Sequence, residues 1–193
     1  MRVWLSMMAV VWLAGCPGDV RPLGDENMGT YVFQAQPQVV ACQLSINTDP
    51  FTFSGTMSRF RDGGHAFLLL QGKNRDAGFD GQVFVSAHTA DSALEECKPC
   101  ATQVQEIITV ALLSKSQSDA LGGQCPPNPL DGGVPAPNDA GITGPGSTDK
   151  GFDSVRACGE MSDVIFATAA NGETCPEKCT ACSFRYQLTG ERQ

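Results

Sequence analysis

The sequence is poor in the residues that most often transfer protons in enzymes and in the residues that bind phosphate. It has only two histidines, His65 and His88, and 13 lysines and arginines against 21 aspartates and glutamates, so its formal net charge is -8. Neither histidine belongs to a pattern such as H-E-x-x-H, and G-x-S-x-G is absent. A negative chain repels nucleic acid and anionic lipid headgroups. The sequence therefore argues against nucleic-acid binding and favours a non-enzymatic role. No catalytic, cofactor-binding or metal-binding residue is predicted. Both histidines are expected at the surface, at strand ends.

Long hydrophobic runs are also lacking, with one exception at the N-terminus. Residues 3–13 (VWLSMMAVVWL) are apolar except for Ser6, and they lie between Arg2 and a group of small residues. A membrane-spanning helix needs about 20 apolar residues, so this run is too short to span. The order of charge, apolar run and small residues predicts a signal peptide over residues 1–15.

The end of that signal, Leu13-Ala14-Gly15-Cys16, resembles the lipobox of bacterial lipoproteins. The resemblance implies that the chain is cut before Cys16 and that Cys16 carries acyl chains. Each buried methylene contributes about 0.8 kcal/mol, so two or three chains hold a protein on a membrane durably. In the same family an aspartate after the cysteine retains the protein at the inner membrane. Because Pro17 stands there, the resemblance implies an outer-membrane lipoprotein of the cell envelope, facing either the periplasm or the surface.

The segment after Cys16 is expected to be a flexible tether. Residues 16–28 are polar and rich in proline, glycine and acids. Loss of residues 1–15 removes Arg2 and no acid, so 12 basic and 21 acidic groups give 12 - 21 = -9. Attachment to the membrane must therefore come from the lipid. Residues 29–193 are enough for one hydrophobic core and predict a single domain.

Eight segments alternate apolar and polar residues or are rich in β-branched residues, which predicts strands. The clearest are 51–60 and 65–71, because Asp62-Gly63 between them is typical of a tight hairpin turn. The others are 30–35, 40–46, 81–87, 106–114, 163–167 and 183–189. The pattern predicts a mostly β fold of about eight strands, either an antiparallel sandwich or a small up-and-down barrel. The first and last strands carry alternating aromatics and are expected to pair and close the sheet.

One short helix is expected at 115–121, with Ser114 as its N-cap and Gly122 as its stop. The preceding segment, 106–114, also fits a helical stripe, but its cluster of β-branched residues favours a strand.

A long surface loop is expected at 126–150, which contains six prolines and five glycines and no periodic apolar face. Cys125 precedes the loop and Cys158 follows it, so a disulfide between them would close the loop at its base.

Nine cysteines are present, and Cys16 is assigned to the lipid. The other eight are an even number in an exported chain, where disulfides form and persist. We expect four bridges, although eight cysteines allow 105 pairings and the sequence does not choose among them. The eight are Cys42, Cys97, Cys100, Cys125, Cys158, Cys175, Cys179 and Cys182.

Two alternatives for these cysteines remain open. Cys97-Lys98-Pro99-Cys100 resembles the C-x-P-C active site of thioredoxin-like proteins, which would imply an extracytoplasmic thiol-disulfide oxidoreductase using Cys97 and Cys100. The two cysteine clusters together have a spacing that suits a tetrahedral zinc site.

A third alternative is calcium. Asp76 to Gly81 reads D-x-G-x-D-G and partly resembles an EF-hand loop, but Gly78 and Ala87 stand where ligands are needed. The pattern D-x-G-F-D occurs here and again at 149–153, and it is more typical of a turn with a phenylalanine anchor entering a strand than of a calcium site.

Taken together, these features predict a lipid-anchored, disulfide-stapled β domain that acts as a binding or structural module. The module is expected to associate with the membrane through the lipid on Cys16. The sequence does not identify a protein or small-molecule partner.

Overall fold

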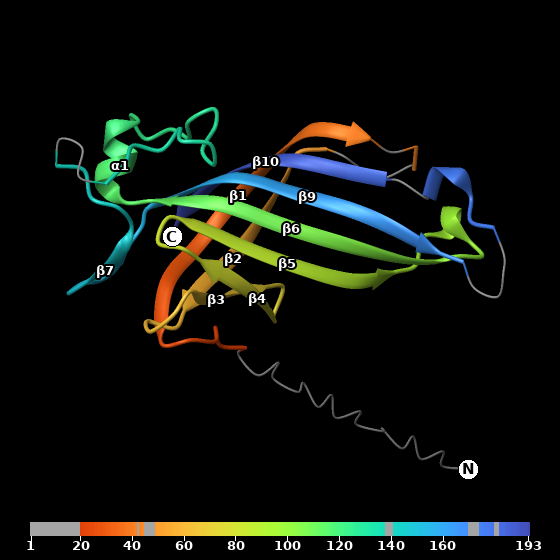
Figure 1. Cartoon of the computed structure of the whole chain (residues 1–193), viewed down its shortest axis with the longest axis horizontal. Helices are drawn as coiled ribbons and strands as arrows, with labels where there is room; N and C mark the ends of the chain where they lie inside the picture. The colour runs from red at the N-terminus through yellow and green to blue at the C-terminus, as the bar shows by residue number, and fades with distance from the viewer. Residues whose placement is uncertain (1–19, 42, 45–48, 138–140, 170–173, 180–181) are drawn as a thin grey trace, which may run out of the picture.

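Eight antiparallel strands close into a barrel in the computed structural model of the chain (Figure 1). The structure describes residues 20–41, 43–44, 49–137, 141–169, 174–179 and 182–193. The barrel strands are β1 (Glu26–Ala41), β2 (Phe51–Arg59), β3 (His65–Leu70), β4 (Lys73–Phe79), β5 (Val83–Ser92), β6 (Ala101–Leu113), β9 (Arg156–Thr168) and β10 (Cys182–Arg192). Each pairs with the barrel strand before and after it in the chain. The mostly β prediction is confirmed with the barrel architecture, and the sandwich alternative is not confirmed.

The first and last strands close the barrel, as the sequence predicted. β1 pairs antiparallel with β10, and Phe33 lies opposite Gly190 while Ala35 lies opposite Leu188. β1 runs on from the predicted strand 30–35 into the first two residues of the predicted strand 40–46, and the second prediction is wrong for Gln43 and Leu44, which lie outside any strand. Its ladder shifts register between Pro37 and Val39. Proline lacks the N–H that a regular ladder needs, so a strand accommodates it at such an irregularity.

The other local predictions are largely confirmed. The turn at Asp62-Gly63 joins β2 to β3, and the segment that also fitted a helical stripe is β6. The helix α1 (Lys115–Ala120) begins at Ser114, whose Oγ accepts from the N–H of Gln117 while the Gln117 side chain accepts from the N–H of Ser114. This reciprocal capping box satisfies two backbone donors that a helix start otherwise leaves free. No helix in the described part of the chain is long and apolar enough to cross a membrane.

Two strands outside the barrel form a small hairpin, β7 (Gly146–Thr148) and β8 (Gly151–Asp153). Phe152 of this hairpin packs edge to face on Phe79 of β4, with ring centroids 5.8 Å apart. The guanidinium of Arg59 lies 5.4 Å from the centre of Phe79 and 5.0 Å from that of Phe152. The two D-x-G-F-D copies therefore contribute their phenylalanines to one cation–π contact, which closes this end of the barrel.

Glu26 binds the same arginine and marks where the folded domain begins. Arg59 Nε donates to Glu26 at 2.7 Å, and Ser147 of β7 donates to Glu26 at 2.6 Å. Burial raises the pKa of Glu26, but these hydrogen bonds and the charges of Arg59 and Arg61 outweigh burial and hold its pKa below the usual value. Residues 26–28, which the sequence assigned to the tether, are the start of β1, because Glu26 is paired inside the fold and Met28 is fully buried.

The opposite end of the barrel is cross-linked by disulfides. The 3-10 turns η1 (Glu95–Cys97) and η2 (Glu177–Cys179) lie side by side there, joined by Cys97–Cys179 and Cys100–Cys175 (Figure 1, right). Cys182 is also disulfide-bonded, and Cys42 lies outside the described residues. We call this region the disulfide end.

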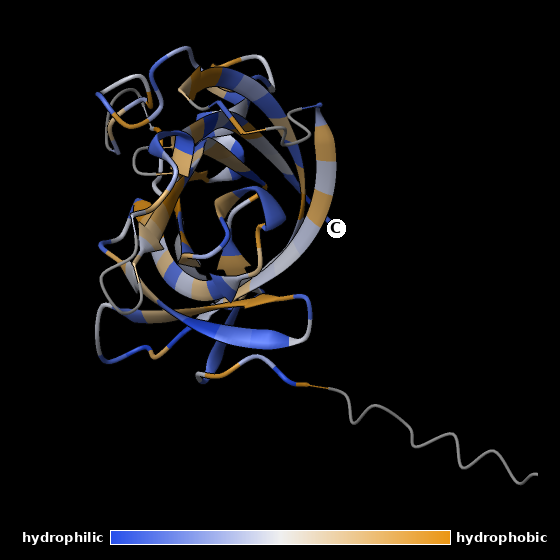
Figure 2. Ribbon diagram, turned by 90° about the vertical axis from the view of Figure 1, so that its right-hand side faces the viewer, coloured by the Kyte–Doolittle hydropathy of each residue, from blue (hydrophilic) through white to orange (hydrophobic). Residues whose placement is uncertain are grey.

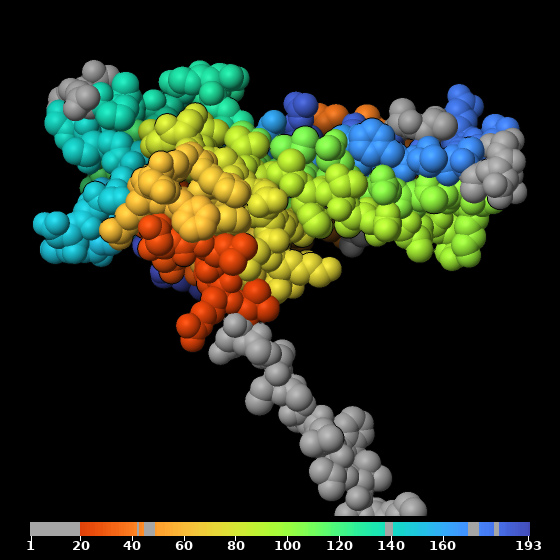
Figure 3. All heavy atoms as spheres, turned by 60° about the horizontal axis from the view of Figure 1, so that its bottom comes forward, coloured from red at the N-terminus to blue at the C-terminus, as the bar shows by residue number. Residues whose placement is uncertain are grey.

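The predicted loop lies at the other end of the molecule (Figure 3, teal). Cys125 and Cys158 form the predicted bridge at its base. The loop is held against α1, because Gln117 Nε2 donates to the carbonyl of Pro135 at 2.8 Å and Ser116 Oγ bonds the carbonyl of Thr143 at 3.0 Å. Part of the predicted loop is therefore ordered structure, including the strand β7.

Candidate functional site

The barrel wall is uneven, and this unevenness exposes part of the interior. β2, β3 and β4 have 9, 6 and 7 residues, whereas the other five barrel strands have between 10 and 16. The five long strands continue past the ends of the short ones toward the disulfide end, from which Figure 2 views the ring of strands. Phe51, Leu70 and Lys73 stand where the short wall stops. We call the interior at this level the mouth.

Four charged or titratable side chains meet at the mouth. Along the sheet His88 of β5 lies opposite Glu106 of β6, and Glu106 lies opposite Asp163 of β9. Residues directly opposite one another point to the same face of a sheet. Arg75 of β4 forms an ion pair with Glu106 across the interior. We call Arg75, His88, Glu106 and Asp163 the mouth cluster.

The mouth cluster lies directly above the apolar core. Two residues further along the same strands, Ile108 and Met161 face each other and are buried. The interior below them is filled by large side chains, among them Tyr31, Phe33, Met57, Leu68, Phe84, Val110, Leu112 and Leu188. Charged groups placed next to such a core lose hydration, and they need partners to compensate for that loss.

Asp163 does not have such a partner for one of its oxygens. Burial raises the pKa of Asp163 from 3.8 to about 6, although the charge of Arg75 acts in the opposite direction. Its Oδ1 is buried, and no donor among the described residues lies within hydrogen-bonding distance. An unsatisfied buried acceptor costs about 1–3 kcal/mol. The site therefore offers an unoccupied acceptor to any donor that enters the mouth.

Arg75 is less exposed than Glu106, its ion-pair partner. Its side chain is 10% exposed, whereas that of Glu106 is 23% exposed. Burial lowers the pKa of Arg75 and the charge of Asp163 raises it. Arg75 Nε is also buried without a hydrogen-bond partner in the described part of the chain. The charge of Arg75 is nevertheless matched, because its NH1 group bonds Glu106.

His88 and Tyr186 complete the polar surroundings. Burial lowers the pKa of His88, and the charges of Arg75 and Lys73 lower it further, so His88 is neutral near pH 7. Burial raises the pKa of Tyr186, and the charge of Asp163 adds to that effect. His88 was predicted at a strand end on the surface. It lies within β5 and faces the interior, whereas His65 does begin β3 and is exposed.

Aromatic side chains form the rim of the mouth on the side of the short wall. Phe51 packs edge to face on Tyr186, with centroids 5.2 Å apart, and Phe53 stacks on Phe33 at 5.0 Å. Phe51 lies opposite the buried Ala35 and so points inward, yet it remains 40% exposed. An inward-facing aromatic that is accessible beside buried charges suits a ligand with a polar head and an apolar body.

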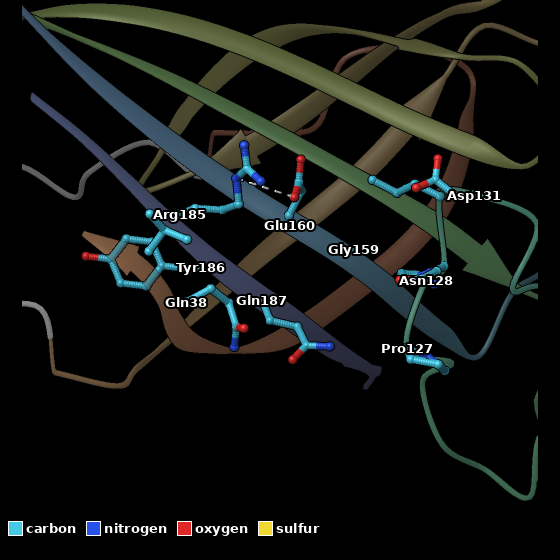
Figure 4. Close-up of a pocket in the computed structure, with 12 residues that line it drawn as sticks. Gln38, Pro127, Asn128, Asp131, Gly159, Glu160, Arg185, Tyr186 and Gln187 are labelled. Atoms are coloured by element: carbon cyan, nitrogen blue, oxygen red, sulfur yellow. Dashed lines mark ion pairs between the residues drawn. The ribbon is translucent and has the colours of Figure 1, made fainter. Parts of the chain in front are cut away.

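A second concave surface lies outside the barrel (Figure 4). It has a volume of about 490 Å³ and is formed by the loop around residues 127–131 and the outer faces of β1, β9 and β10. Glu160 and Arg185 form an ion pair there at 3.8 Å, and both side chains are exposed. These two charges already pair with each other and are exposed to water, so they add little binding free energy for a ligand. The mouth, where the charges are buried, is the better candidate site.

The structure separates the cysteines that the oxidoreductase alternative requires. Cys97 and Cys100 belong to two different bridges, with Cys179 and Cys175 as partners. A C-x-P-C site works by opening and closing one bridge between its own two cysteines. The same four cysteines are oxidised and provide no thiolates for zinc.

The calcium alternative also finds no support. Asp76 and Gly78 lie within β4, and Asp80 Oδ1 accepts from the N–H groups of Gln82 and Val83 at 2.9 and 2.7 Å. This carboxylate is used for the turn between β4 and β5. No group of three or more His, Cys, Asp or Glu residues that could hold a metal ion occurs in the described ranges.

Sequence reasoning missed the mouth cluster, although part of its signal was readable. Asp163 lies between Met161 and Ile165 on one face of a strand, and Glu106 shares a face with Ile108. A charged residue inside an apolar period-two stripe is a sign of an interior polar site. Arg75 was not readable in this way, because its strand was not predicted.

The fold and the mouth define a class of protein: an antiparallel up-and-down barrel with a polar cluster at one end of a filled interior. No protein-family model matches the chain, and neither a curated protein nor a solved structure matches it significantly.

Proposed function

We propose that this protein is a lipid-anchored binding module of the cell envelope, whose barrel mouth holds a small molecule with an apolar body. The observation that carries the proposal is Asp163, a carboxyl with a buried, unsatisfied oxygen, whose charge acts on Tyr186 of the aromatic rim that includes the accessible Phe51. Buried polar atoms in native proteins nearly always have a hydrogen-bond partner. Where the protein supplies none, water or a bound molecule takes that place. A ligand donating to Asp163 while covering Phe51 would satisfy both features.

Anchoring is supported by the lipobox-like end of the signal segment, Leu13 to Cys16, and by how the chain leaves the domain. The N–H of Leu23 donates to Asn74 Oδ1 at 3.3 Å, and the Asn74 amide donates to the carbonyl of Arg21 at 3.0 Å. Asn74 follows Lys73 at the rim, so the N-terminal segment (Figure 3, red) meets the barrel on the short wall. A lipid on Cys16 would thus be attached on the side of the barrel that is formed by the short strands β2, β3 and β4.

Replacing Cys16 by serine tests the anchor. We expect the wild-type chain to be recovered from the membrane fraction with a diacylglyceryl group on Cys16, and the Cys16→Ser chain to lose both the acyl mass and the membrane association. Mass spectrometry of the N-terminal peptide measures this. A wild-type N-terminus that carries no lipid would refute the anchor and leave the binding function standing.

A neutral photoreactive probe with an alkyl diazirine tests binding at the mouth. Labelling of Phe51 should saturate with probe concentration, because a site has a fixed capacity. Phe166 is a matched control, since it is 46% exposed but lies on the outer face of β9, between the buried Ile165 and the inward-packed Ala167. Its labelling should rise linearly. Equal, unsaturated labelling of Phe51 and Phe166, read by peptide mass spectrometry on the full chain, would refute binding at the mouth.

A further inference from the structure

We infer that the ligand of the mouth is a cation, namely a primary amine or ammonium group on an apolar body that contains an aromatic ring. This inference rests on the proposed binding function and specifies its substrate class. It follows from the unmatched carboxylate among the buried charges, the unsatisfied acceptor on Asp163 and the aromatic groups at the rim.

The buried charges at the mouth do not balance. Arg75 is the one deeply buried cation of the cluster, and its charge is matched by Glu106 in a direct ion pair. Asp163 is then left as a second carboxyl that interacts with the charge of Arg75 but forms no ion pair with it or with another cation among the described residues. Because an uncompensated buried charge is costly, a cation entering next to Asp163 gains a strong interaction.

The groups that face Asp163 from the neighbouring strands make an anionic ligand unfavourable. On β6, Glu106 lies directly opposite Asp163, and on β10 the neighbour is Phe184. An anion near Asp163 would therefore meet two carboxylates. Lys73 on β4 carries a positive charge, but its side chain lies at the exposed rim, where water screens it.

Of the two unsatisfied atoms in the cluster, the acceptor on Asp163 points to the same class, whereas the donor Arg75 Nε calls for a neutral acceptor such as water because its charge is already matched. Asp163 Oδ1 is an acceptor, and an ionised carboxylate only accepts hydrogen bonds. An ammonium group has three donors and no acceptor, and a bond between two ionised groups is about twice as strong as a neutral one. Phe51 and Tyr186 at the rim supply aromatic faces for the apolar body and for cation–π contact.

Three matched probes separate the ligand classes: 4-phenylbutylamine, 4-phenylbutanol and 4-phenylbutyrate, which differ only in the polar end. Titration calorimetry is done with the full chain in phosphatidylcholine vesicles, and the heats from empty vesicles are subtracted. We expect the amine to bind at least about tenfold more tightly than the alcohol or the acid, a difference of about 1.4 kcal/mol.

Variants on one strand assign that difference to Asp163. Asp163→Asn should lower the amine affinity at least about tenfold and leave the alcohol affinity unchanged. Glu160→Gln is the matched control, because Glu160 lies on the outer face of β9, and this change should alter neither affinity. Lowering the pH from about 7.5 to about 5 should weaken amine binding to wild type, because the pKa of Asp163 is about 6 and its carboxylate becomes neutral in this range.

The outcomes distinguish the inference from the function on which it rests. Equal or stronger binding of the alcohol or the acid overturns the cationic class and leaves a binding mouth. Amine binding that is unchanged in Asp163→Asn also overturns it, since the amine would then sit elsewhere. Failure of all three probes to bind counts against both the class and the binding function.

Discussion

Removing both bridges between η1 and η2 will lower the free energy of unfolding by about 6 kcal/mol, whereas removing either bridge alone will cost about 2 kcal/mol. The bridges are Cys97–Cys179 and Cys100–Cys175, with sequence separations of 82 and 75 residues. Cysteine-to-serine pairs remove each bridge without leaving a free thiol.

The reason is that the two bridges close nearly the same loop. In the chain-entropy account, the first bridge across a loop of this length contributes about 4 kcal/mol. Once it is present, the second bridge closes only a small ring through residues 97–100 and 175–179, which contributes about 2 kcal/mol. Either bridge alone therefore supplies most of the stabilisation that comes from closing the shared loop. The loss on removing both must exceed the sum of the two single losses.

Urea unfolding of the four forms, wild type, each single removal and the double removal, measures this coupling. The bridge Cys125–Cys158 at the other end of the molecule is the control, because its removal should add to either single removal without coupling. If the losses in free energy of unfolding on removing Cys97–Cys179 and Cys100–Cys175 simply add, the two bridges stabilise the fold by another route than loop closure.

The features that the sequence predicted well are those decided by neighbouring residues. Asp62-Gly63 lies in the turn between β2 and β3, as expected for such a pair between two alternating segments, and Ser114 caps α1 through Gln117, three residues on. The bridge between Cys125 and Cys158 was readable because these two cysteines flank a segment that is rich in proline and glycine and has no periodic apolar face. In each case the residues that determine the feature lie within one short segment or directly flank it.

The features that the sequence did not reveal depend on strand register. The long β1 continues past Pro37 because β10 supports it on the other side of the irregularity, which no local pattern shows. β4 has a polar sequence, and it is a strand because Ala77 and Phe79 alternate toward the interior and pair with β5. The two cysteines of C-x-P-C pair with distant partners for the same reason.

The mouth cluster is the clearest case of this limit. Arg75, Glu106 and Asp163 come from three strands, and 88 positions of the chain separate the first from the last. Arg75 looks like an ordinary surface charge in sequence, and only the apolar residues two positions away indicate an interior position for Glu106 and Asp163. Only the closure of the barrel and the register of β5, β6 and β9 place them together above the core.

Replacing Asp163 by asparagine should make the free protein more stable near neutral pH, by about 1–2 kcal/mol. The pKa of Asp163 is raised from 3.8 to about 6 in the folded state by burial, with Arg75 opposing. Between these two values the folded state binds more protons than the unfolded state, so this group makes stability fall as the pH rises through that window. A shift of about 2 units corresponds to about 3 kcal/mol, which solvent screening at the partly open mouth reduces.

Asparagine carries no charge at any of these pH values, so the variant does not bear the cost of ionising a buried carboxyl. The gain over wild type should be present at about pH 7.5 and should vanish below about pH 4, where the wild-type carboxyl is protonated in both states. Urea unfolding at both pH values measures it, with Glu160→Gln on the same strand expected within about 0.5 kcal/mol of wild type. If Asp163→Asn instead destabilises the protein at about pH 7.5, then Arg75 holds Asp163 as a true ion-pair partner. The unmatched carboxylate on which the cationic ligand depends would then not exist.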